Sequence, residues 1–134
     1  MVTRAWIAAG VDVVMVLLFA VVGRRSHSEA DTVAGVLLTA WPFLVATLIG
    51  SVFGLIIRNR VAQGDAYGWG SAITVWVTTV IGGMLLRLGA GTGAAWPFWI
   101  VAFITLGILL LGWRLAARAI IRARSRTASD GAAR

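Results

Sequence analysis

Four apolar runs, each close to 20 residues long, constrain this chain more than any other feature of its sequence. A helix rises about 1.5 Å per residue, so about 20 residues cross a hydrocarbon core of roughly 30 Å. Inside that core every backbone amide must be paired, which a helix achieves within its own segment. We therefore predict an all-α fold, an integral membrane four-helix bundle over residues 1–114. Its helices are expected at about 5–23, 33–57, 69–88 and 95–113.

The composition agrees with a membrane protein. Of the 134 residues, 60% are hydrophobic and 13% charged, and the mean hydropathy is +0.91, which is far too apolar for a soluble domain. The segments between the runs, GRRSHSEADT, RNRVAQGDAYG and LGAGTG, supply charge and glycine. The first run is longer than the apolar region of a signal peptide and has no cleavage site after it, so we expect it to be retained. The sequence has no cysteine, which excludes disulfides and thiolate metal sites.

The arginines predict the orientation of the bundle. With an even number of spans, both termini and the loop between the second and third helices share one side of the membrane. That side carries nine arginines and the other side three. The positive-inside rule then predicts cytoplasmic termini and a multi-pass protein of the bacterial plasma membrane. The nine are Arg4, Arg58, Arg60, Arg114, Arg118, Arg122, Arg124, Arg126 and Arg134; the three are Arg24, Arg25 and Arg87.

The net charge of +7 follows from this topology and requires no nucleic-acid partner, because the chain has no basic polar domain with stacking aromatics. Residues 115–134 are predicted to form a basic amphipathic and partly disordered cytoplasmic tail. Arginine recurs every four residues at Arg114, Arg118 and Arg122, and Arg124 follows. These arginines would contact the anionic headgroups of membrane lipid. The simpler alternative is positive-inside anchoring followed by a frayed polar end.

Asp12 is the ionisable residue that stands out within the spans. It follows Arg4 by eight residues, and a lone carboxylate at such a depth costs roughly 2.5–3.5 kcal/mol on insertion. Arg58 and Arg114 close the second and fourth helices on the same side, so their long side chains could reach it. Arg87 is a worse candidate because it lies near the other side. Two interpretations stay open: an anchoring ion pair, or a proton or cation site.

Most of the seven tryptophans fit interfacial belts. Trp6, Trp69 and Trp113 are placed at the cytoplasmic interface, and Trp96 and Trp99 at the outer one. Trp41 and Trp76 lie deeper, and they either pack the bundle or line a cavity for an apolar or cationic ligand.

Polar and small residues within the spans are expected to hold helices together. Hydroxyls such as those of Thr47 and Ser51 usually bond carbonyls of their own helix or a neighbouring helix. The segment GSVFG places Gly50 and Gly54 one turn apart. This spacing permits close helix approach, either inside the bundle or between protomers.

The tetrapeptide AWPF occurs twice, each time before a helix that runs toward the cytoplasm. Pro42 and Pro97 precede Arg58 and Arg114 by nearly the same number of residues, which suggests a parallel two-helix repeat. Pro97 follows a glycine loop and suits a first helical turn. Pro42 follows the apolar VAGVLLTA, so we predict a continuous helix, kinked there, with an inward-facing Trp41.

Sequence motifs for common enzyme classes are absent. The chain has no HExxH, GxSxG or P-loop pattern, and GAGTG lacks the strand and the acid of a dinucleotide site. We expect no enzymatic activity, no cofactor and no metal. His27 lies in the outer loop near Glu29 and Asp31. It would be a pH sensor or a weak metal ligand, or more simply a solvated loop histidine.

Four sequence blocks carry a resemblance: GRRSHSE at 23–29, TAWPFL at 39–44, VWVTTVIGGMLLR at 75–87 and LLGWR at 110–114. They resemble the recurrent blocks of a family of small four-helix membrane proteins of actinobacteria and haloarchaea, catalogued as domain of unknown function 3054. The similarity extends from about Asp12 to Arg114. It implies the four-helix architecture and an actinobacterial setting, and no established activity follows from it. The positions that it marks for testing are Asp12, Arg24, His27, Trp41, Pro42 and Arg87.

Two classes of function remain open. The first is a small transporter or channel component, or a binder of an apolar ligand, that uses Asp12. A chain this short has no room for an internal path, so a transporter would be a homo-oligomer. The small multidrug-resistance transporters offer an analogy, since they too have four short helices and an acid in the first. The second class is a non-catalytic scaffold or accessory subunit of a larger membrane complex.

Overall fold

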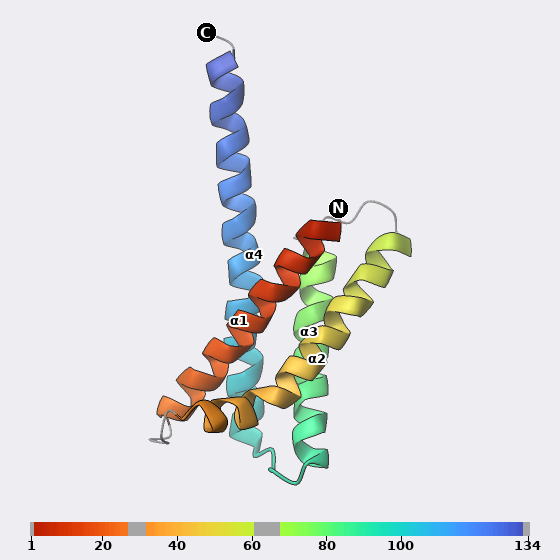
Figure 1. Cartoon of the computed structure of the whole chain (residues 1–134), viewed down its shortest axis with the longest axis vertical. Helices are drawn as coiled ribbons and strands as arrows, with labels where there is room; N and C mark the ends of the chain where they lie inside the picture. The colour runs from red at the N-terminus through yellow and green to blue at the C-terminus, as the bar shows by residue number, and fades with distance from the viewer. Residues whose placement is uncertain (1, 27–31, 61–67, 133–134) are drawn as a thin grey trace.

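The computed structural model describes residues 2–26, 32–60 and 68–132. These residues form four helices, α1 (Val2–Ser26), α2 (Val33–Arg60), α3 (Trp69–Gly89) and α4 (Trp96–Ala132) (Figure 1). Each helix is long and apolar enough to cross a membrane. The prediction of an all-α protein with four helices long and apolar enough to span a membrane is therefore confirmed. The helices α1, α2 and α4 extend beyond the ends expected from hydropathy, and α4 does so by the largest margin.

The four helices form two crossing layers. The pair α1 and α2 leans across the more upright α3 and α4 (Figure 1). Contacts join α1 to α2, α2 to α3, α3 to α4 and α4 to α1, and the α2–α3 contact is the most extensive. We call the end of the bundle where α1 begins and α4 projects beyond the other helices the tail end. The end that holds the α3–α4 loop is the opposite end.

The core lies between the two layers and contains three phenylalanine rings. Phe43 and Phe98 are the last residues of the two AWPF copies, and their ring centroids lie 6.3 Å apart. Phe19 of α1 lies 5.2 Å from Phe43, edge to face, and 6.3 Å from Phe98. Such tilted arrangements are favoured by the aromatic quadrupole, so the cluster links three helices. Buried aliphatic residues extend this core: Val16, Val80, Met84, Ala102, Leu106 and Leu110.

Glycines allow α2 and α3 to pack closely. A methyl group on Gly50 would lie 3.2 Å from the Cα atom of Val75, and one on Gly54 would lie 3.2 Å from Oγ of Ser71. The GSVFG segment is therefore used inside the bundle of a single chain. Gly83 of α3 faces the ring of Phe43, which occupies the space of a side chain there.

Helix α2 continues without a break through Pro42. Its first turns, orange in Figure 1, run in a different direction from the yellow remainder, as expected where proline removes a backbone N–H and crowds the preceding turn. Pro42 and Phe43 are both buried. The prediction of an inward-facing Trp41 is wrong, because Trp41 is 38% exposed. Successive residues of a helix point about 100° apart, so the turn that buries Pro42 and Phe43 directs Trp41 outward.

The second AWPF copy begins a helix. Helix α4 starts at Trp96, and Pro97 lies in its first turn, where a missing N–H costs nothing. The loop before it has positive φ angles of 70° at Gly91 and 73° at Gly93, a conformation that favours glycine. The two copies of AWPF therefore differ in structure, one within a helix and one at a helix start.

Helix α4 projects beyond the other three helices at the tail end (Figure 1). The predicted helical continuation is present, and the segment expected to be frayed or disordered is helical as far as Ala132. Arg118 is partly buried, whereas Arg122, Arg124 and Arg126 are exposed.

Replacement of Arg118, Arg122 and Arg124 with Gln is expected to weaken the preference of the protein for anionic over zwitterionic lipid. Each basic residue near an anionic surface contributes about 1 kcal/mol, so three substitutions lower the preference by about two orders of magnitude. Lipid retention measured by native mass spectrometry, with phosphatidylglycerol and phosphatidylcholine as probes, checks this. Membrane insertion should be unchanged, and an unaltered preference would contradict a lipid-binding tail.

Candidate functional site

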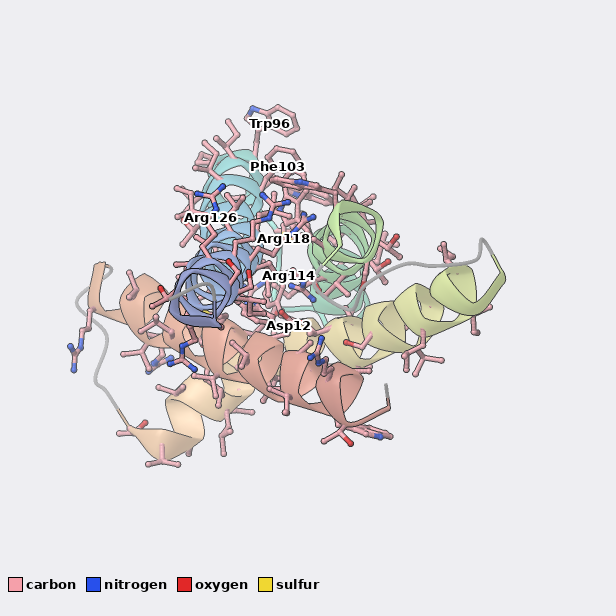
Figure 2. The ribbon with its side chains drawn as sticks, turned by 90° about the horizontal axis from the view of Figure 1, so that it is seen from above. Asp12, Trp96, Phe103, Arg114, Arg118 and Arg126 are labelled. Atoms are coloured by element: carbon pink, nitrogen blue, oxygen red, sulfur yellow. The ribbon has the colours of Figure 1, made fainter. Side chains whose placement is uncertain are left out.

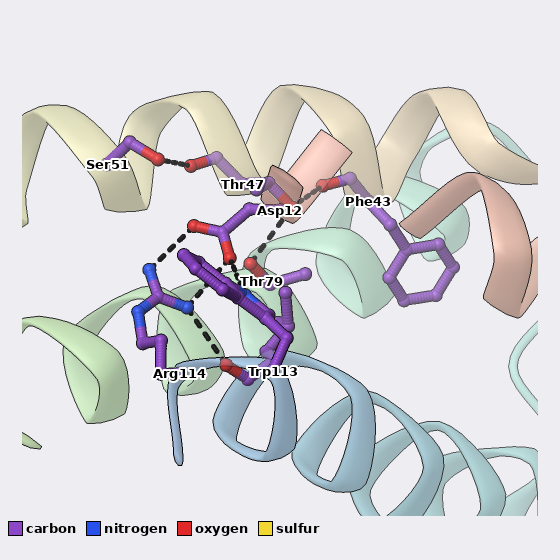
Figure 3. A network of polar contacts seen from close by, with 8 residues as sticks. Asp12, Phe43, Thr47, Ser51, Thr79, Trp113 and Arg114 are labelled. Atoms are coloured by element: carbon purple, nitrogen blue, oxygen red, sulfur yellow. Dashed lines mark hydrogen bonds and ion pairs between the residues drawn. The ribbon is translucent and has the colours of Figure 1, made fainter. Parts of the chain in front are cut away.

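The first candidate site is a buried ion pair between α1 and α4. Asp12 Oδ2 lies 2.6 Å from Nη2 of Arg114, and Arg114 Nη1 donates to Asp12 Oδ1 at 2.7 Å (Figure 3). Trp113 Nε1 also donates to Oδ1, at 2.8 Å. The exposed fractions of the two charged side chains are 1% for Asp12 and 3% for Arg114. The pair is thus a bidentate, charge-assisted contact that is almost fully buried.

The local sequence explains why α4 supplies two groups to one carboxylate. Trp113 and Arg114 are neighbours near the tail end of α4, and the Arg114 guanidinium lies 4.8 Å from the Trp113 ring. Arg114 Nη1 also donates to the carbonyl of Leu110, one turn earlier, at 2.9 Å. These contacts hold the guanidinium over α1. Its Nε is buried without a hydrogen-bond partner among the described residues.

The structure selects one partner from the predicted candidates. Arg114 pairs with Asp12, whereas the side chain of Arg58 lies outside the described part of the chain. Arg87 is in the last turn of α3 at the opposite end. Seen along the bundle, Asp12 and Arg114 lie between the helices (Figure 2). The assignment of Trp113 to an interfacial belt missed its bond to Asp12, and its position next to Arg114 was the available signal.

The ion pair forms part of the wall of a cleft at the tail end. The cleft has a volume of about 110 Å³ and is lined by residues of all four helices. Small side chains make up much of the lining: Ala5, Ala8, Ala9, Ser51, Gly54 and Ser71. Trp6, which also lines it, is 69% exposed, so the cleft reaches the surface of the bundle.

Hydroxyl groups beside the ion pair bond to helix carbonyls, as predicted. Thr47 donates to the Phe43 carbonyl at 2.6 Å, and Ser51 donates to the Thr47 carbonyl at 2.9 Å (Figure 3). The hydroxyls of Thr47 and Thr79 lie 3.0 Å apart, both buried. They join α2 to α3.

Trp76 packs between helices and lies away from the cleft. Its Nε1 donates to the carbonyl of Phe103 at 3.1 Å, and the two rings lie 4.5 Å apart. A methyl group on Gly107 would lie 3.2 Å from the Trp76 indole, so this glycine makes room for it. Of the two interpretations of Trp76, the structure favours packing.

Two more of the predicted residues meet at the opposite end. Arg24 of α1 and Arg87 of α3 line one cavity of about 270 Å³, together with Phe19, Thr39 and Phe98. The guanidinium of Arg87 lies 4.6 Å from the centroid of the Phe98 ring. His27 lies outside the described residues. Within residues 2–26, 32–60 and 68–132, no group of three or more His, Cys, Asp and Glu side chains could hold a metal ion.

Comparison with known proteins identifies one family that matches this chain. One family, described as "Protein of unknown function (DUF3054)", matches residues 9–117. No curated protein matches the chain, and no solved structure matches it. The matched range covers the ion pair and the cavity at the opposite end, and all of the cleft lining except Ala5, Trp6 and Ala8.

Proposed function

Because the chain belongs to the DUF3054 family, whose description assigns no activity, we propose a function from the site itself: a small membrane carrier that couples anion binding at Arg114 to protonation of Asp12. The observation that carries this proposal is the bidentate Asp12–Arg114 pair in the wall of the tail-end cleft. By the arginine asymmetry, we place the tail end at the cytoplasmic face of a bacterial plasma membrane.

The coupling follows from charge balance within a medium of low dielectric constant. The closed pair is neutral, and protonation of Asp12 alone would leave the Arg114 cation buried without a counter-ion. Breaking such a pair costs about 3–5 kcal/mol. An anion that replaces the carboxylate on the guanidinium restores the balance, and Asp12 then takes up one proton. Anion and proton therefore bind together, and each raises the affinity for the other.

The dimensions of the cleft limit the class of anion. A volume of about 110 Å³ suits a few water molecules or an anion with few non-hydrogen atoms, such as a small carboxylate or an inorganic oxyanion. The core residues Val16, Phe43 and Leu106 are fully buried beyond the cleft, so the described residues of one chain offer no continuous path. We propose that transport takes place in a homo-oligomer in which helix movements open this core.

Addition of acetate, nitrate or phosphate to the purified protein in weakly buffered detergent tests the coupling. We expect at least one of these anions to cause proton uptake, read with an indicator dye, because Asp12 is protonated as the anion occupies Arg114. The signal should disappear in Asp12→Asn and persist in Asp12→Glu, which keeps the acid. Arg118→Gln, one turn beyond Arg114, serves as the matched control for charge on α4.

A proton signal that survives Asp12→Asn would remove Asp12 from the coupling. The absence of a signal with all anions would favour a second candidate function, a non-catalytic scaffold or accessory subunit. One observation supports that alternative: both Asp12 oxygens are already bonded, so the pair can serve as a permanent link between α1 and α4. The projecting basic part of α4 would then meet a partner subunit.

A further inference from the structure

The opposite end of the bundle holds two adjoining cavities between α1, α3 and α4. One has a volume of about 270 Å³ and the other about 540 Å³, and the larger is within the range of ligand sites. They share four lining residues, Phe19, Gly23, Arg87 and Phe98, so they lie next to each other. We call the two together the opposite-end cavity.

Two arginines lie on one side of the opposite-end cavity. Arg24 is in the last turn of α1 and Arg87 in the last turn of α3, and both line the smaller part. Arg87 is held against the Phe98 ring at 4.6 Å, a cation–π contact. The Arg24 guanidinium lies over Gly35, where a methyl group would come within 2.5 Å of Nη2, and Arg24 Nη1 contacts Thr39 Oγ1 at 3.4 Å.

The larger part of the cavity is apolar and opens on the lipid-facing surface. Its lining includes Ala94, Pro97, Phe98 and Val101. Val101 is 53% exposed, and it lies on a helix that is long and apolar enough to cross a membrane. The cavity therefore presents guanidinium groups near the helix ends, at the depth of lipid headgroups, and an apolar surface that continues toward the hydrocarbon.

We propose that the opposite-end cavity binds one anionic phospholipid, with its phosphate between Arg24 and Arg87 and an acyl chain along Phe98, Pro97 and Val101. The guanidinium fork donates paired hydrogen bonds to phosphate oxygens, and the apolar surface selects a lipid over a free anion. The site lies at the other end of the bundle from the Asp12–Arg114 pair and is independent of the carrier proposed above.

Native mass spectrometry of the full chain, titrated with phosphatidylglycerol and with phosphatidylcholine of the same acyl chains, tests the site. We expect phosphatidylglycerol to bind more tightly than phosphatidylcholine. Arg87→Gln should lower its apparent affinity about tenfold or more, because hydrogen bonds to a charged group are lost. Gly35→Ala should also weaken binding, since the added methyl group displaces the Arg24 guanidinium without changing the net charge.

Three controls distinguish lipid binding at this site from general electrostatic attraction to the protein. Arg25→Gln makes the same charge change one residue from Arg24 on an exposed side chain outside the cavity lining, and should leave the tightest lipid in place. The Gln variants of Arg118, Arg122 and Arg124 remove basic charge at the tail end. They should lower the preference for anionic lipid among the additional lipids that bind at the tail, and leave the single tightest phosphatidylglycerol in place. Ala94→Phe fills the apolar part and should reduce the binding of phosphatidylglycerol, with both arginines retained.

The proposal is overturned if Arg87→Gln and Arg25→Gln weaken phosphatidylglycerol equally, since charge alone would then explain the binding. It is also overturned if inorganic phosphate displaces the lipid as well as phosphatidylglycerol does, because the apolar part would then have no role. Glu29→Gln combined with Asp31→Asn completes the test. Arg24 and Arg87 have further contacts in the protein, and the lipid is expected to bind with those contacts in place. The unaltered protein should therefore retain phosphatidylglycerol, and the proposal fails if only this variant retains it.

Discussion

Replacement of Arg114 with Gln is expected to lower the free energy of unfolding by about 3–5 kcal/mol. The substitution removes both contacts to the Asp12 oxygens, at 2.6 and 2.7 Å, and leaves a carboxylate that is only 1% exposed. Trp113 would remain as its one described donor. Equilibrium unfolding in detergent micelles, followed by the loss of helical circular dichroism, measures the change. The same loss is expected for Asp12→Asn, because the guanidinium is then left buried.

A double variant distinguishes the loss of the pair from the loss of packing. Asp12→Leu combined with Arg114→Met replaces the two charges with apolar side chains of similar size and is expected to recover most of the stability. Arg118→Gln, on the same helix and one turn away, should change stability by well under 1 kcal/mol because its side chain is not in the core. If Arg118→Gln were as harmful as Arg114→Gln, the ion pair would not be the cause.

Replacement of Phe43 with Ala is expected to cost about 2–4 kcal/mol. Phe43 is fully buried, contacts the rings of Phe19 and Phe98, and fills the space that Gly83 leaves in α3. In a membrane, the unfolded helix also places this ring in an apolar medium, so the loss arises from the cavity rather than from transfer to water. The expected loss of stability is therefore at or below the range for Phe→Ala substitutions in the cores of soluble proteins. Thermal unfolding of the detergent-solubilised protein measures it.

Phe53→Ala is the matched control for this cavity. Phe53 is on the same helix and is 53% exposed on the surface of the bundle. Its substitution with Ala removes the same atoms as Phe43→Ala. Lipid or detergent fills the space that it leaves, so we expect a change below 1 kcal/mol. Equal losses for the two variants would mean that the three-ring cluster does not hold α1, α2 and α4 together.

The partner of Asp12 shows where inference from sequence reaches its limit. Depth and residue type reduced the candidates to Arg58 and Arg114, because both close helices at the tail end. The choice depends on how α4 is rotated about its own axis, and rotation is a property of packing between helices. The same rotation brings Trp113 to the carboxylate, where the belt rule had placed it in the headgroup region.

The error at Trp41 has a similar physical origin. The expectation of an inward-facing indole rested on depth in the membrane, yet depth says nothing about direction around the helix. Burial of Pro42 and Phe43 determines that direction, and a neighbour about 100° away faces lipid. In an apolar solvent an outward tryptophan carries little penalty, so hydropathy cannot distinguish the two directions.

The amino-acid sequence alone determined the number of spanning helices, their approximate limits and the extension of the fourth as a basic helix. These properties depend on the length and polarity of local segments, since an apolar segment of about 20 residues satisfies its own backbone in lipid. Only the tertiary structure decided that Arg114 and Trp113 bond Asp12, and that Arg24 and Arg87 line one cavity. Those contacts join residues far apart in the chain. They depend on the rotation, tilt and bend of whole helices, which the α2–α3 glycines, Pro42 and the three phenylalanines determine together.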